Sequence, residues 1–135
     1  MTHPLVRYPC SSDTPTSSLP FSPSVVFGDL IFVSGQASVD QHGTIISDTF
    51  EGEFRRSVAN LAKVLEASGS DLGHVIQTRN YVRDDEDLPL YNRLYREVFQ
   101  QPFPARTTIV QCLGAAIRYE IEAVAVVRKD SSHAG

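Results

Sequence analysis

Two segments of this chain have the apolar spacing of amphipathic helices, and five or six others have the pattern of β-strands. This ratio limits the fold more than any other feature. Two helices form one layer and can cover only one face of a sheet. The other face then needs a partner, and further copies of the same chain are the simplest source. The pattern therefore predicts an α+β fold with both helices packed on one face of the sheet. It also predicts that the protein forms oligomers.

Turn and capping residues mark the ends of these segments. Asp48 and Glu51 are a predicted capping box, and Gly69 is the expected stop of the first helix. Asp87 is the expected N-cap of the second helix, with Pro89 in its first turn. In chain order we expect two strands within 24–36 with a turn at Gly28-Asp29, a short strand after a turn at Gly43, a helix within 48–69, a strand within 74–84, a helix within 85–99, and strands at 106–112 and 118–128.

The chain has 135 residues, which is enough for one globular domain. Residues 1–20 are rich in Ser, Thr and Pro without periodicity, so we expect a flexible N-terminal arm. Residues 21–128 form the single expected domain, and residues 129–135 an expected frayed tail.

Charge and composition exclude several classes of function. A net charge of -4 counts against a nucleic-acid partner, because binding phosphates needs a concentrated basic surface. We expect no membrane association, since no apolar run approaches the roughly 18 residues that a spanning helix needs. Cys10 and Cys112 lie far apart, and the four histidines are scattered, so we expect no metal site. These features, with no signal-peptide pattern at the N-terminus, predict a reduced cytoplasmic protein.

Three charged residues stand in or beside the last two expected strands. Glu120 and Glu122 fall on the same face of a strand as Val124, because side chains alternate along a strand. Arg106 opens the preceding strand. One interpretation is a structural Arg–Glu pair across neighbouring strands. The other is that Arg106 offers its planar fork to a carboxylate ligand while one glutamate holds or activates a water molecule. A small 2-oxo or 2-imino acid would suit such a fork.

Four motifs stand in order along the chain, namely "FVSGQ" (32–36), "YNRLYREVF" (91–99), "FPAR" (103–106) and "YEIEAVAV" (119–126). Together they resemble the RidA family, also called YjgF or L-PSP proteins, over roughly residues 20–128. The resemblance implies a chorismate-mutase-like α+β fold, a homotrimer with sites between subunits, and no cofactor. It also implies hydrolysis of reactive 2-imino acids, the tautomers of enamines such as 2-aminoacrylate, to 2-oxo acids and ammonia.

The resemblance also assigns site residues. Arg106 matches the carboxylate-binding arginine and Glu120 the acid that orients water. Taken alone, Ser34-Gly35 is typical of a tight strand exit, and Asn92 of a solvent-facing helix position. Two positions depart from the family pattern, because this chain has Phe21 where a tyrosine is usual and Thr108 where a cysteine is usual. The substrate-binding residues implied are Phe21, Ser34, Gly35, Asn92 and Thr108.

Other functions remain open at this point. The same cleft could serve a non-catalytic protein that binds small 2-oxo acids for regulation. A deaminase for a different enamine, such as an aminomuconate, is chemically close. A ribonuclease activity has been attributed to members of the family, but the acidic charge and the lack of a plausible histidine pair argue against it here.

Overall fold

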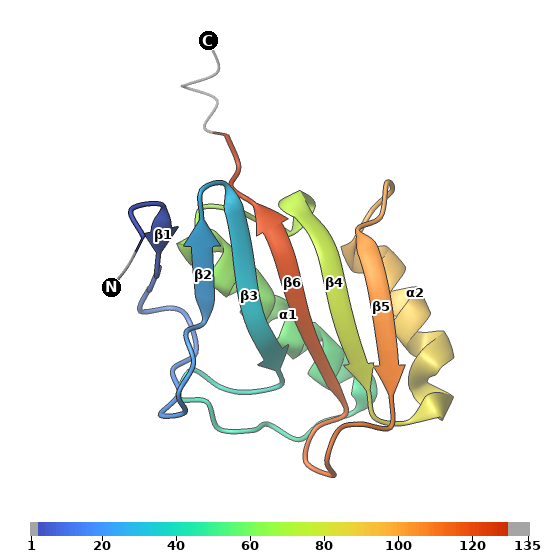
Figure 1. The fold of residues 1–135 in the computed structure, drawn as a ribbon. Coiled ribbons are helices and arrows are strands. Elements are labelled where there is room, and N and C mark those ends of the chain that lie inside the picture. Colours follow the sequence, from blue (N-terminus) through green and yellow to red (C-terminus); the bar gives the residue numbers. More distant parts are fainter. Residues whose placement is uncertain (1–2, 130–135) are drawn as a thin grey trace.

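The computed structural model describes residues 3–129, which form one mixed six-stranded sheet and two α-helices (Figure 1). Both helices lie against the same face of the sheet. No helix in this part of the chain has the length and apolar character needed to cross a membrane. The elements are β1 (Val6–Arg7), β2 (Ser24–Phe27), β3 (Leu30–Ala37), α1 (Phe50–Ala67), β4 (Val75–Val82), α2 (Leu88–Val98), β5 (Ala105–Val110) and β6 (Tyr119–Val126).

The strand order across the sheet is β1-β2-β3-β6-β4-β5. All neighbouring pairs are antiparallel except β4 and β5, which α2 connects as parallel strands. The predicted α+β class, with two helices on one sheet face, is confirmed. The sheet also places β4 between β5 and β6, so the strands that carry Arg106 and Glu120 are not neighbours.

Helix α1 begins one residue later than the capping box predicted. Thr49 is the N-cap, and its side chain accepts a hydrogen bond from the Gly52 backbone N–H. The Asp48–Glu51 box is therefore wrong, because the N–H donors at this end are satisfied by Thr49 and by Glu53, whose carboxylate accepts from the Asp48 N–H. The C-terminal prediction is confirmed, since Gly69 has a φ of +87° directly after the C-cap residue.

The other boundaries shift by a few residues. The turn at Gly43 forms, but the segment after it makes only one isolated bridge, between Val39 and Ile45, rather than a strand. Asp87 is the N-cap of α2 without a side-chain hydrogen bond. Strand β5 ends at Val110, because Gln111 has a positive φ of 62° and leaves the extended conformation.

The segment before β2 contacts the rest of the domain at several places. Residues Val6–Arg7 pair with Phe27 and Val26 of β2, which makes β1 an edge strand that the sequence did not predict. Farther along, the Thr16 N–H and hydroxyl both donate to the Gln41 carbonyl, at 3.0 and 3.2 Å. Residues 130–135 of the expected frayed tail lie outside the described residues.

The core lies between the helices and the sheet, and aromatic rings fill its centre. Phe54 from α1, Tyr91 from α2 and Tyr119 from β6 are fully buried and contact one another, with centroid distances of 4.7–6.5 Å. The opposite sheet face has no such cover among residues 3–129. Large apolar side chains are exposed there on neighbouring strands, namely Phe27, Leu30 and Phe32.

Candidate functional site

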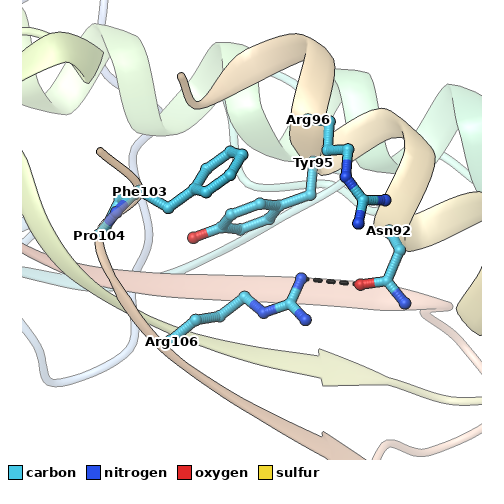
Figure 2. Close-up of a pocket in the computed structure, with 6 residues that line it drawn as sticks. All are labelled: Asn92, Tyr95, Arg96, Phe103, Pro104 and Arg106. Carbon is cyan, nitrogen blue, oxygen red and sulfur yellow. Dashed lines mark hydrogen bonds between the residues drawn. The ribbon is translucent and has the colours of Figure 1, made fainter. Parts of the chain in front are cut away.

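Arg106 lines an open hollow between β5 and α2 (Figure 2). Its guanidinium carbon lies 5.0 Å from the centroid of the Tyr91 ring and 4.9 Å from that of Tyr95. One guanidinium nitrogen donates a 2.9 Å hydrogen bond to Asn92 Oδ1. The hollow has a volume of about 210 Å³, and its other lining residues are Arg96, Phe103 and Pro104. An arginine held on two aromatic faces keeps its remaining N–H donors in a fixed direction.

The two tyrosine rings are themselves held in place. The hydroxyl groups of Tyr91 and Thr108 are 2.7 Å apart, as are those of Tyr95 and Thr78. Burial raises the pKa of Tyr91 to about 12 and raises the pKa of Tyr95 as well, so both remain neutral near pH 7. The contact between the Thr108 and Tyr91 hydroxyl groups helps to orient the Tyr91 ring against which Arg106 lies.

Arg106 and Glu120 lie on opposite faces of the sheet. Arg106 is in register with Thr78 of β4, which is buried on the helix side. Glu120 alternates with Tyr119 and Ile121, both of which point into the helix-side core, so its own side chain points to the other face. The structural interpretation of an Arg–Glu pair across neighbouring strands is wrong.

Glu122 has partners of its own on that second face. It accepts a hydrogen bond from the Tyr81 hydroxyl and lies 3.6 Å from an Arg79 nitrogen. Glu122 is thus engaged within the chain, whereas the Glu120 carboxylate has no hydrogen-bond or ion-pair partner among residues 3–129. Burial raises the pKa of Glu120 above its ordinary value, and the negative charge of Glu122 raises it further.

Glu120 lines a second, larger hollow of about 320 Å³ together with Phe21 and Gly35. A Cβ atom at position 35 would lie 2.7 Å from Glu120 Oε2, so the carboxylate rests against the backbone there and a larger residue at position 35 would displace it. Ser34 donates from its hydroxyl to the Ser22 carbonyl at 2.6 Å, which ties the segment carrying Phe21 to β3. Ser34 and Gly35 lie inside β3, at a register shift against β6, and not at a strand exit.

The predicted site residues thus fall into two groups within one chain. We call Asn92, Arg106 and Thr108, with the two tyrosines, the arginine half-site. We call Phe21, Ser34, Gly35 and Glu120 the glutamate half-site. Sequence reasoning missed the roles of Tyr91 and Tyr95, although two tyrosines four residues apart around Asn92 already place two rings on one helix face.

The residues present suit a small anionic ligand rather than a metal ion. No cluster of three or more His, Cys, Asp or Glu side chains that could hold a metal occurs within residues 3–129. The fold and the two half-sites define the class of protein. It is an α+β protein with one arginine oriented to bind a carboxylate and, separately, one partly buried glutamate.

Comparison with known proteins identifies the particular family. The family described as Endoribonuclease L-PSP matches residues 11–127. The chain belongs to this family, known also as the RidA or YjgF family.

Individual relatives agree with this assignment. The chain is 34% identical to the mitochondrial protein mmf2 of Schizosaccharomyces pombe over 76% of this chain and 81% of that protein. It is 33% identical to the 2-iminobutanoate/2-iminopropanoate deaminase of Homo sapiens over 79% of this chain and 80% of that protein. The crystal structure of the yjgF gene product from E. coli matches with a TM-score of 0.79 and 29% identity, over 90% of this chain and 99% of that one.

Proposed function

We propose that this chain hydrolyses reactive 2-imino acids to 2-oxo acids and ammonia, without a cofactor. The observation that carries the proposal is the arginine half-site. Arg106 is held by two tyrosine rings and Asn92, and its contacts among residues 3–129 include no carboxylate partner. A fixed guanidinium fork of this kind matches the carboxylate of a 2-imino or 2-oxo acid. Relatives named 2-iminobutanoate/2-iminopropanoate deaminase support the same reaction.

The chemistry needs a second group that handles water. Arg106 holds the substrate carboxylate, and Glu120 accepts a proton from a water molecule as its oxygen bonds to the imine carbon. The product of this step is a tetrahedral carbinolamine. Glu120 then returns this proton to the nitrogen. As the C–N bond breaks, the hydroxyl proton of the carbinolamine passes through Glu120 to the leaving nitrogen, so that a carbonyl and ammonia result. One water is consumed, and Glu120 ends in its starting state.

Glu120 suits this role because of its surroundings. Burial, together with the charge of Glu122, raises the pKa of Glu120, which makes its carboxylate a stronger base than an ordinary surface carboxylate. The carboxylate also lies against the backbone of Gly35, which limits the positions it can take. A water molecule bound to it is therefore presented in a narrow range of directions.

The two half-sites must come from two copies of the chain, because they occupy opposite faces of one sheet. We propose a homotrimer in which the exposed apolar face around Phe27, Leu30 and Phe32 is covered by neighbouring copies. Each interface would join the arginine half-site of one copy to the glutamate half-site of the next. The predicted cytoplasmic location remains a prediction, since one relative is named as a mitochondrial protein.

The test compares turnover with ligand binding in Glu120→Gln. Imines made in situ by an amino-acid oxidase are followed by their disappearance, and binding of 2-oxobutanoate is measured by calorimetry. The amide keeps the size of the side chain but cannot accept the proton, so we expect a loss of about 10²–10⁴-fold in kcat with binding retained. A wild-type protein that binds 2-oxobutanoate without hydrolysing any imine would instead support a regulatory 2-oxo acid-binding protein.

A further inference from the structure

The hollow beside Glu120 extends well beyond the space that the reacting atoms of a small imino acid need. Its volume of about 320 Å³ reaches the size range of pockets that bind whole small ligands, about 300–1,000 Å³. A substrate with a methyl or ethyl side chain would leave most of this space to water. The size of the hollow therefore raises the question of what fills it.

The lining of this hollow is mostly apolar. Three segments outside the sheet and helices contribute, namely the segment before β2, the loop between β3 and α1, and the loop before β6. The end of β3, Val64 of α1 and Glu120 of β6 complete the lining. Among the lining residues of the described chain, Glu120 carries the single ionisable side chain. The apolar side chains that project into the hollow include Leu19, Phe21, Val39, Ile45 and Ile117.

The polar lining groups are already engaged within the protein. The Thr16 hydroxyl donates to the Gln41 carbonyl at 3.2 Å, and Gln36 donates from its amide nitrogen to the Ser34 carbonyl at 3.0 Å. Ser17 accepts from the Leu19 N–H at 3.0 Å. A second charge or an amide on a ligand would find few partners here, whereas an apolar group loses nothing on entering.

We propose that this hollow receives the substrate side chain and selects 2-imino acids with bulky apolar side chains, the size of leucine's, over those with a methyl group. The inference rests on the proposed function, because Glu120 must face the imine carbon for the side chain to extend into the hollow. Leu19 and Ile45 are then specificity-determining residues. The segment before β2 acts as one wall of the pocket, held by the contacts between Thr16 and Gln41.

The first test compares imines made from leucine and from alanine. Each methylene buried from water improves binding by about fourfold, and a hydrophobic pocket discriminates about 10–200-fold per missing methylene. We expect kcat/KM for the leucine-derived imine to exceed that for the alanine-derived imine by at least about 10-fold. Equal values, or a preference for the alanine-derived imine, would overturn the inference while leaving the proposed function intact.

The second test removes the apolar walls in the double variant Leu19→Ser/Ile45→Ser. Leu19 is 65% exposed and Ile45 is 47% exposed, so the fold should tolerate the change. We expect the selectivity to fall below about 3-fold, through a higher KM for the leucine-derived imine. The matched control is Leu5→Ser, an exposed leucine of the same N-terminal segment that does not line the hollow, and it should keep the wild-type ratio. An unchanged ratio in the double variant would overturn the inference.

Binding of 2-oxo acids separates the two proposals. Calorimetry with 4-methyl-2-oxopentanoate and with pyruvate measures the side-chain preference without any turnover. If no imine is hydrolysed but 4-methyl-2-oxopentanoate still binds at least about 10-fold more tightly, the proposed reaction fails and the ligand class stands. If pyruvate binds as tightly as 4-methyl-2-oxopentanoate, the proposed preference for bulky apolar side chains is wrong, whether or not the protein hydrolyses imines.

Discussion

Arg106 is an exposed cation whose guanidinium group is oriented by neighbouring side chains. It has no anionic partner among residues 3–129. An exposed arginine normally samples many rotamers, and fixing it costs about 2 kcal/mol of side-chain entropy. Here the rings of Tyr91 and Tyr95 and the amide of Asn92 offset that cost before any ligand arrives. Such an arrangement lowers the cost of binding a carboxylate, since the fork is already oriented.

The first prediction follows from the shape of this group. In Arg106→Lys the charge is kept, but the two parallel N–H donors and the planar face over the tyrosine rings are lost. Because a hydrogen bond to a charged group contributes roughly 1.5–3 kcal/mol, we expect kcat/KM to fall at least ~10-fold. Imine hydrolysis and thermal unfolding are measured together. A lysine variant with near-native turnover would show that charge alone is sufficient and that Arg106 is not a fork for the substrate.

The second prediction concerns the pH dependence set by Glu120. The glutamate acts as a base only when ionised, and burial together with Glu122 raises its pKa above 4.5. The acid limb of kcat/KM should therefore lie above that pH. Replacing Glu122 by Gln removes the nearby negative charge, so the pKa of Glu120 falls and the acid limb moves to lower pH. The amide oxygen can still accept the hydrogen bond from Tyr81.

The measurement is the pH profile of kcat/KM between about pH 4 and pH 8. Glu97→Gln serves as the control, because Glu97 pairs with Arg55 in the helix layer and should leave the profile unchanged. An acid limb that stays in place in Glu122→Gln would mean that another group controls the reaction.

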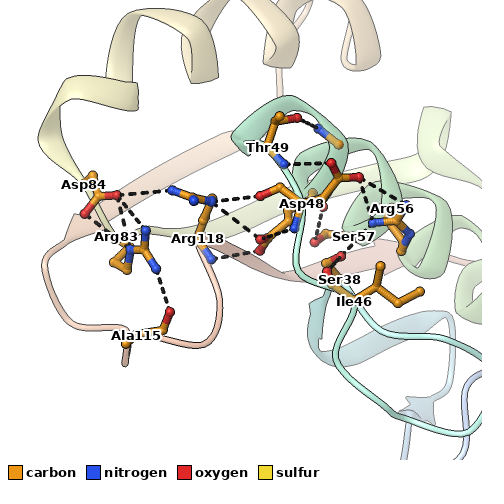
Figure 3. A network of polar contacts seen from close by, with 12 residues as sticks. Ser38, Ile46, Asp48, Thr49, Arg56, Ser57, Arg83, Asp84, Ala115 and Arg118 are labelled. Carbon is orange, nitrogen blue, oxygen red and sulfur yellow. Dashed lines mark hydrogen bonds and ion pairs between the residues drawn. The ribbon is translucent and has the colours of Figure 1, made fainter.

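At the scale of elements, a polar network joins α1 to the loop before β6. Glu53 is fully buried in α1, and its carboxylate accepts hydrogen bonds from the backbone N–H groups of Asp48 and Arg118. The Arg118 side chain donates to the Asp48 carbonyl and lies 3.8 Å from Asp84 (Figure 3). This network holds the start of β6 and, two residues later, Glu120.

The third prediction is that Glu53→Ala is strongly destabilising. The change leaves two partly buried N–H groups without their acceptor and removes the buried anion beside Arg118. An unsatisfied buried donor costs about 1–3 kcal/mol, so we expect a loss of at least about 2 kcal/mol in the free energy of unfolding, measured by urea titration. Glu51→Ala on the same helix removes only an exposed pair with Arg55 and should cost about 0.5 kcal/mol or less. Similar losses in both variants would contradict this account.

The sequence predicted elements better than it predicted their ends and contacts. Apolar periodicity located α1, and the glycine at position 69 located its end. Both signals depend on neighbouring residues alone. The N-cap at Thr49 was missed because of a long-range contact. Glu53 accepts the hydrogen bond from the Asp48 N–H, and its carboxylate is held there by the backbone N–H of Arg118, 65 residues away. The stacking of Arg106 on Tyr91 and Tyr95 was missed for the same reason, as it requires α2 to cross over β5.

The sequence could not show how the candidate site residues divide between the two faces of the sheet. Alternation along β6 placed Glu120 and Glu122 on one face, yet it could not show that Glu122 contacts Tyr81 and Arg79. The order of strands in a sheet is decided by long-range pairing, and no local pattern placed β4 between β5 and β6.

At the scale of the whole molecule, the division of the site and the uncovered sheet face point to the same assembly. One chain presents the arginine half-site on the helix side and the glutamate half-site on the other. A sheet face with exposed Phe27, Leu30 and Phe32 gains stability when it is buried between copies. In a cyclic assembly every copy then uses both of its half-sites, each with a different neighbour.

The last prediction tests this assembly through complementation. Arg106→Ala lacks the fork but keeps Glu120, and Glu120→Gln lacks the base but keeps Arg106, so each variant alone should be inactive. When the two are unfolded together, mixed equally and refolded, random assembly gives about a quarter of all interfaces an intact Arg106 and an intact Glu120. We therefore expect imine hydrolysis to recover to about a quarter of the wild-type rate, while light scattering shows trimers. Two intact residues would never meet if each site belonged to a single chain. A mixture that assembles normally and stays as inactive as its components would therefore rule out a site shared between subunits.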